Sequence, residues 1–156
     1  MAHNTLTFNN CLQDVQGYVC LGDTSSLAKR LSISADLTPV YAEQIKSANR
    51  RVEIVDNKYV LVSDEIQTGE KPTTMRWTML TPTKAELKGK NKILLSHKNK
   101  HLLMKISAPV KVRLQTWSTA PTTPYDAPNP GTVLVGFESS LRPNSHYTFQ
   151  VKLIPE

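Results

Sequence analysis

The sequence contains few of the residues that cross-link small proteins or build metal ribbons. It holds two cysteines in 156 residues, Cys11 and Cys20, and no Cys-x-x-Cys pair. Neither a disulfide framework, a zinc ribbon nor a thioredoxin-like site is therefore predicted. We expect both thiols to be half-buried small hydrophobic groups, with a disulfide between neighbouring strands as the less favoured alternative. A chain of this length fits one domain and can fold without such cross-links.

Long apolar runs are also absent. No stretch of about 18 apolar residues occurs, so a membrane-spanning helix is not predicted. No basic segment followed by an apolar core resembles a signal peptide, and if a longer parent protein is exported, we expect its signal upstream of this sequence. A nucleophile elbow, a phosphate-binding glycine loop and a His-Glu-x-x-His motif are missing too. These absences remove the common hydrolase, nucleotide-binding and metalloprotease signatures.

Positive charge is in excess. The net charge is +6, with a pI of about 9.4, which favours polyanionic partners such as acidic polysaccharide or nucleic acid. Lysines gather around the hairpin predicted at residues 93–106, and no aromatic residues alternate with them, which argues against nucleic acid. The alternative is a solvated surface whose lysines discourage edge-to-edge aggregation. The candidate polyanion-binding residues are Lys88, Lys90, Lys92, His97, Lys98, Lys100 and His101.

Strand patterns dominate the remaining sequence. Apolar and polar residues alternate with a period of two, which is typical of strands with one buried face. Asp56-Asn57 predicts a hairpin turn, residues 38–47 predict one short helical crossover beginning at Thr38-Pro39, and the proline-rich residues 118–132 predict a long loop. We therefore predict an all-β antiparallel sandwich of roughly 10–12 strands. The predicted strands are residues 3–8, 31–35, 51–55, 59–62, 74–80, 93–97, 102–106, 110–117, 133–137 and 147–153.

Both tryptophans, Trp77 and Trp117, lie in predicted strands. Each could stack on a sugar ring, but a tryptophan in a strand of a sandwich is more often part of the core. We expect both to be core residues.

Several segments, in this order and spacing, resemble the heparinase II/III family of polysaccharide lyases. His3-Asn4-Thr5-Leu6 is similar to the His-Asn-Thr signature of that family, and Leu80 ends a tryptophan-led strand where relatives often have histidine. The resemblance covers essentially the whole chain. The other matching segments are residues 35–41, 50–55, 59–66, 77–80 and 117–138.

The resemblance implies an N-terminal α/α toroid packed against a C-terminal β-sandwich. It also implies β-elimination on a uronic-acid-containing polysaccharide, in which a base removes the proton beside the carboxylate and an acid assists the leaving oxygen. Tyrosine and histidine usually fill those roles, mostly from elements upstream of the His-Asn-Thr segment. The family is bacterial in the members that the chain most resembles, and a periplasmic or secreted parent protein is implied.

A histidine at the start of a predicted strand leads us to expect that the chain is the C-terminal piece of a larger protein, with residues 1–156 forming one sandwich domain. In the family this histidine completes a zinc site, so the resemblance implies that His3 is a ligand in the full-length parent. One histidine cannot hold zinc alone, because structural sites need about four ligands. We expect no cofactor in this chain by itself.

Two functions follow as hypotheses. The first is a scaffold domain of a heparinase II/III-like lyase, inactive by itself, whose partners are the toroid and an acidic polysaccharide, with no nucleic acid or membrane. It predicts an apolar patch near the N-terminus. The second is a stand-alone carbohydrate- or polyanion-binding module that uses the lysine-rich hairpins. We assign no catalytic residue, because nothing in the sequence places a histidine or arginine beside Tyr18, Tyr41, Tyr59, Tyr125 or Tyr147.

Overall fold

The computed structural model describes residues 4–27, 30–121 and 127–156 and consists of two antiparallel sheets. The predicted all-β fold with one short helix is confirmed. The four-stranded sheet has the order β1 (Leu6–Phe8), β6 (Thr73–Thr81), β11 (Val133–Leu141) and β10 (Arg113–Ser118). The eight-stranded sheet has the order β2 (Leu21–Leu27), β3 (Arg30–Asp36), β4 (Ser47–Val55), β5 (Tyr59–Gln67), β12 (His146–Pro155), β9 (Lys100–Ser107), β8 (Lys92–His97) and β7 (Lys84–Lys88).

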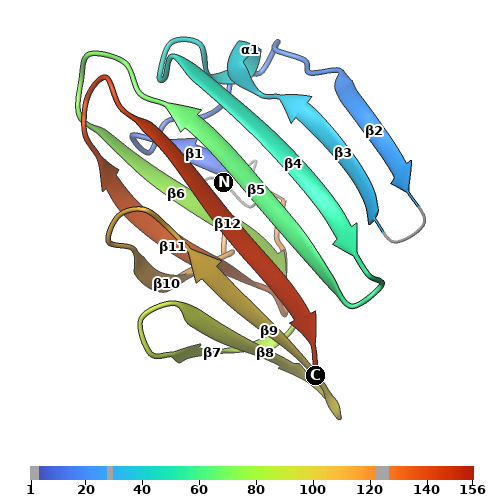
Figure 1. Cartoon of the computed structure of the whole chain (residues 1–156). Helices are drawn as coiled ribbons and strands as arrows, with labels where there is room; N and C mark the ends of the chain where they lie inside the picture. The colour runs from blue at the N-terminus through green and yellow to red at the C-terminus, as the bar shows by residue number, and fades with distance from the viewer. Residues whose placement is uncertain (1–3, 28–29, 122–126) are drawn as a thin grey trace.

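The two sheets lie face to face, with the core between their inner faces (Figure 1). The ring of Trp77 on β6 stacks on Phe137 of β11 at a centroid distance of 6.0 Å, and Phe137 contacts Phe149 of β12 at 5.9 Å. These side chains come from both sheets and are at most 3% exposed. Alternation along the strands thus places one aromatic cluster between the layers.

Turn chemistry sets the hairpins as the sequence predicted. Asp56 and Asn57 have φ values of 54° and 52°, so both adopt the left-handed conformation, and they lie in a three-residue loop because Val55 pairs with Tyr59. The helix α1 (Thr38–Tyr41) is a single turn between β3 and β4, shorter than predicted, with its proline in the first turn. The strands β2 and β7 were not predicted. β2 contains no alternation of apolar residues, and β7 alternates over only five residues with two apolar side chains, Ala85 and Leu87.

The eight-stranded sheet is wider than the sheet that covers it. On the inner face of its β3–β4 end, Leu31 is 49% and Ile54 41% exposed, although their strand neighbours Ile33 and Val52 are half-buried. This end of the inner face is therefore not covered by the four-stranded sheet. No helix in the described ranges is long and apolar enough to cross a membrane.

Candidate functional site

The segment that resembles the His-Asn-Thr signature runs alongside strand β6. The side-chain oxygen of Asn4 accepts a hydrogen bond from the backbone N–H of Leu80 at 2.6 Å. The carbonyl of Thr5 accepts from the backbone N–H of Thr78 at 3.1 Å. His3, the predicted zinc ligand, lies outside the described residues. The asparagine and threonine of the signature therefore act in this chain as clamps that continue the β1–β6 pairing.

A buried ion pair holds the same segment from the other side. The guanidinium of Arg50 on β4 donates to both carboxylate oxygens of Asp64 on β5, at 2.6 and 3.0 Å. The indole N–H of Trp77 donates to the same carboxylate at 3.0 Å, and Arg50 also donates to the carbonyl of Asn4 at 3.2 Å. Asp64 is 1% exposed, so its charge is desolvated and needs all three of these donors.

The hydroxyl of Tyr41 completes this network at the end of α1. It donates to the carbonyl of Leu6 at 2.6 Å, accepts from the side-chain amide of Gln13 at 2.7 Å, and lies 2.9 Å from the Thr5 hydroxyl. Burial raises the pKa of Tyr41 above its usual value, although the hydrogen bond with Thr5 opposes this shift. A general base needs a pKa near the working pH and a free oxygen, so Tyr41 is a structural residue here.

Sequence reasoning missed this network. A signal was available in the sequence. Arg50 lies two residues after buried Ala48 and Asp64 lies two residues after buried Val62, so each charged residue is on the same face of its strand as a core residue. A charged residue on the buried face of a strand is expected to have a partner. The alternation along each strand, however, does not indicate which two strands are neighbours.

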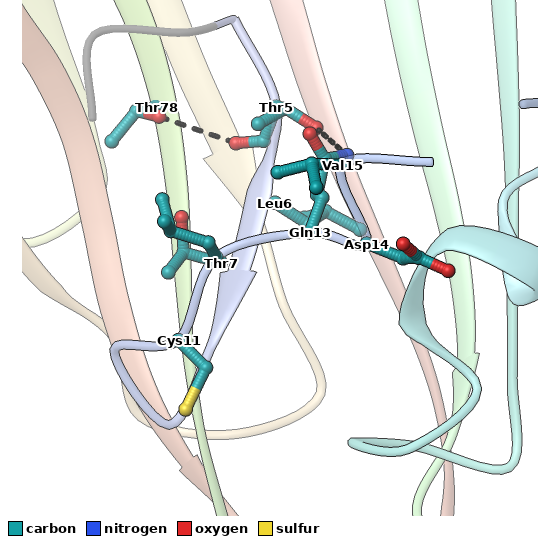
Figure 2. Close-up of a pocket in the computed structure, with 9 residues that line it drawn as sticks. Thr5, Leu6, Thr7, Cys11, Gln13, Asp14, Val15 and Thr78 are labelled. Atoms are coloured by element: carbon teal, nitrogen blue, oxygen red, sulfur yellow. Dashed lines mark hydrogen bonds between the residues drawn. The ribbon is translucent and has the colours of Figure 1, made fainter. Parts of the chain in front are cut away.

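A small cavity of about 160 Å³ opens beside β1. Figure 2 shows its lining, with Thr5 hydrogen-bonded to Thr78 on one side and to Gln13 on the other, with Cys11 below them and Asp14 to the right. The lining carries hydroxyl, amide and apolar groups and a single carboxylate. That set can hydrogen-bond a small polar molecule, but it does not pair an acid with a base.

The described residues do not form a metal site. Nowhere in ranges 4–27, 30–121 and 127–156 do three histidine, cysteine or acidic side chains gather closely enough to hold an ion. The zinc implied by the resemblance would need ligands in addition to those of these ranges, so no chemical step is assigned to it here.

The predicted polyanion-binding residues separate into two groups at opposite ends of β8. Lys88 pairs directly with Lys92, and Lys90 lies in the turn between them. At the other end His97 pairs with Lys100 across a turn at Lys98. Since a strand advances by about 3.3 Å per residue, Lys92 and His97 lie about 17 Å apart. The second group also includes His101, whose Nδ1 lies 3.0 Å from the Ser96 hydroxyl.

The first group adjoins a groove of about 740 Å³ at the open edge of the sandwich. Lys90, Lys105 and Lys111 line it, and none of its lining residues is acidic. Its apolar lining comes from β7, β9, β10 and the connection before β10. Those side chains are Leu87, Ile106, Ala108, Val110, Val112 and Leu114.

Two expectations about single residues need correction. Trp77 is a core residue as predicted, but Trp117 is half-buried on the outer face of the four-stranded sheet, with the guanidinium of Arg76 4.9 Å from its ring centroid. The prediction was wrong because the register pairs Trp117 with outward-facing Leu134. Cys11 and Cys20 are both free, as expected, but exposed instead of half-buried.

Comparisons with solved structures show the same fold in heparinase III and in a heparan sulfate lyase. A heparan sulfate lyase from Pedobacter heparinus superimposes with a TM-score of 0.79 at 15% identity, over 99% of this chain and 24% of its own. A crystal structure of heparinase III gives a TM-score of 0.74 at 15% identity, over 98% of this chain and 23% of its own. A heparinase III with methylated lysines gives 0.74 at 14% identity, over 99% and 23%.

No protein-family model matches the sequence, and no curated protein is significantly similar to it. The superpositions show that the chain has the fold of a heparinase III-type β-sandwich, as the resemblance implied. The chain spans about a quarter of the length of these solved structures.

Proposed function

We propose that this chain is the C-terminal β-sandwich domain of a heparinase II/III-like polysaccharide lyase and that its role is that of a scaffold. The observation that carries the proposal is the similarity of fold, which extends over 98–99% of the chain to lyases that are about four times as long. In such a protein the substrate would be an acidic polysaccharide that contains uronic acid. The catalytic groups would come from elements other than those described here.

The exposed apolar surface near the N-terminus supports the scaffold role. Leu12, Val15 and Tyr18 are 60%, 88% and 81% exposed, and Leu21 at the start of β2 is 71% exposed. All four side chains belong to residues 12–21, and where exposed apolar side chains form a contiguous patch they mark an interaction surface. A toroid domain packed there would bury them, as the sequence predicted.

The site beside β1 supports a positioning role over a catalytic one. Polar groups at the start of β1 hold the chain in place: Asn4 bonds to β6, Thr5 bonds to β6 and to the Tyr41 hydroxyl of α1, and Arg50 of β4 bonds to Asn4. Such a clamp holds the segment that follows it in a defined direction. In the parent protein, His3 would be a zinc ligand together with ligands supplied by other elements.

The test compares the chain alone with the chain joined to its upstream coding sequence. Absorbance of the new C4–C5 double bond is followed on heparan sulfate, heparin and alginate. We expect flat traces from residues 1–156 and a rise from the joined protein. A rise in absorbance with residues 1–156 alone contradicts the scaffold role. An upstream sequence that does not encode an α/α toroid contradicts the proposal that the chain is a domain of such a lyase.

A further inference from the structure

Four lysines form a continuous row across the eight-stranded sheet. The strand register places Lys88 of β7 opposite Lys92 of β8, Lys92 opposite Lys105 of β9, and Lys105 opposite Lys152 of β12. Neighbouring strands lie about 4.8 Å apart, so the row spans roughly 14 Å. We call these four residues the lysine track: Lys88, Lys92, Lys105 and Lys152.

The lysine track projects from the outer face of the sheet. Along each strand the residues next to these lysines point to the opposite face, and Ile93, Ile106 and Val151 are at most 2% exposed in the core. Lys88, Lys92 and Lys105 are exposed and Lys152 is half-buried. The track therefore faces away from the four-stranded sheet, on the side that the core does not use.

The charges of the track are only partly compensated. Glu86 forms an ion pair with Lys88, and the ammonium of Lys152 lies 4.1 Å from the ring centroid of Tyr59. Within the part of the chain that the structure describes, no carboxylate forms an ion pair with Lys92 or Lys105. Like charges directly opposite each other in a sheet are destabilising, so the track has a cost in stability that an anionic ligand would remove.

Protection of a sheet edge does not account for the track. Lysines on an edge strand discourage pairing with another chain, and β7 is the edge strand here. The other three lysines lie on β8, β9 and β12, whose two sides are both paired. Only Lys88 can therefore serve at the edge, and the remaining three need another explanation.

An apolar row of side chains flanks the track on one side and a polar row on the other, and these rows suit the C–H face and the hydroxyl groups of a sugar ring. On one side lie half-buried apolar side chains at paired positions, Leu94, Leu103 and Ile154. On the other side lie polar side chains at paired positions, Ser107, Gln150 and Ser63. Apolar side chains can contact the C–H face of a pyranose ring, while amide and hydroxyl groups can bond to its hydroxyls.

We propose that the lysine track binds a linear acidic polysaccharide laid across the strands, with sulfate or carboxylate groups contacting successive lysines. The groove lined by Lys90, Lys105 and Lys111 begins at the same end of the sheet, because Lys105 belongs to both features. It continues the positive surface around that edge. This inference goes beyond the proposed scaffold role, since it gives the chain a binding activity that needs no lyase chemistry.

Acidic polysaccharide fits the track better than nucleic acid. Single-stranded nucleic acid is held by aromatic side chains on which bases stack. Tyr59 is the aromatic residue beside the track, and Lys152 covers its ring. The track offers lysines, hydroxyls, an amide and aliphatic side chains, a set that suits charged sugars.

The experiment compares two double variants with the same change in charge. Lys92→Gln/Lys105→Gln removes the centre of the track, and Lys98→Gln/Lys100→Gln removes two lysines from the other end of the same hairpin. Binding of a heparin oligosaccharide to residues 1–156 is measured by calorimetry at about 0.05 and 0.15 M NaCl, with alginate as the carboxylate-only probe. We expect the first variant to lose about tenfold in affinity and the second less than about threefold.

A third variant, Lys92→Arg/Lys105→Arg, keeps the charge and is expected to bind within about twofold of the unmodified chain, while circular dichroism checks that each variant is folded. Equal losses in the two glutamine variants overturn the proposal, because net charge alone would then explain binding. Absence of heparin and alginate binding at the lower salt also overturns it. Tighter binding of a single-stranded oligonucleotide of equal charge assigns the surface to nucleic acid and rejects the polysaccharide.

Discussion

The carboxylate of Asp64 accepts two hydrogen bonds from the guanidinium of Arg50, and the pair lies where the two sheets and the start of β1 meet. Asp64 is 1% exposed and the Arg50 side chain 15%, so neither charge has much solvent to replace its partner. The pair joins β4 to β5, and its further bonds reach Trp77 on β6 and the carbonyl of Asn4. It thereby links the eight-stranded sheet to the N-terminal clamp.

Replacement of Asp64 by asparagine should destabilise the chain strongly. The substitution leaves the Arg50 charge unpaired in a poorly solvated position, for which we expect a loss of about 3–5 kcal/mol in the free energy of unfolding. Urea denaturation measures the loss, and Glu65→Gln on the exposed face of the same strand is the matched control, expected within about 0.5 kcal/mol. A loss below about 1 kcal/mol for Asp64→Asn would show that the ion pair contributes little.

Removal of the Tyr41 hydroxyl should loosen β1. In Tyr41→Phe the carbonyl of Leu6 and the side-chain amide of Gln13 each lose a partner. We expect a loss of about 1–3 kcal/mol together with faster amide hydrogen exchange in β1. Tyr18→Phe, at an 81% exposed tyrosine, is the control. Unchanged exchange in β1 would contradict the role of this hydroxyl as its anchor.

Acid should weaken the chain through Glu53. The side-chain hydrogen bond from Arg30 holds the pKa of Glu53 below its usual 4.5, with Arg51 acting in the same direction. The folded state therefore binds the proton less readily than the unfolded state. Stability from this group is present above pH 4.5 and is lost as the pH falls through the lowered value.

The measurement is the free energy of unfolding of the unmodified chain and of Glu53→Gln between pH 3 and pH 7. We expect the difference between them to be largest at neutral pH and to shrink on acidification. Arg30→Gln, which removes the main cause of the shift, should reduce that pH dependence. A difference that is constant over the whole range would rule out the linkage.

A methyl group at Gly136 should not fit. A Cβ built there would lie 1.9 Å from the carbonyl oxygen of Trp77 on the neighbouring strand, so the backbone of β6 or β11 must move. We expect Gly136→Ala to cost about 1–3 kcal/mol. Gly69→Ala, where nothing lies within 4 Å of the added carbon, should change stability by less than about 0.5 kcal/mol. Equal thermal midpoints for the two variants would contradict the close approach.

Local pattern was enough to determine the class of fold. Period-two alternation predicted most of the strands, and the Asp56-Asn57 pair predicted a hairpin turn, because both are local properties of the backbone. The resemblance around His3-Asn4-Thr5 pointed to the lyase-type sandwich, which the solved structures share. The strand β2 was not predicted because its serines and threonine do not alternate with apolar residues, and β7 was not predicted because its alternation spans only five residues.

Only the tertiary structure decided which charged residues meet. Alternation along a strand specifies the face that a residue occupies, but it does not specify which strand lies beside it. Arg50 meets Asp64 because β4 pairs with β5, and Lys152 joins Lys105 because the last strand inserts between β5 and β9. The hairpins β7–β8 and β8–β9 place the predicted lysine group at two ends of β8, and the long-range pairing of β9 with β12 adds Lys152 to the lysine track.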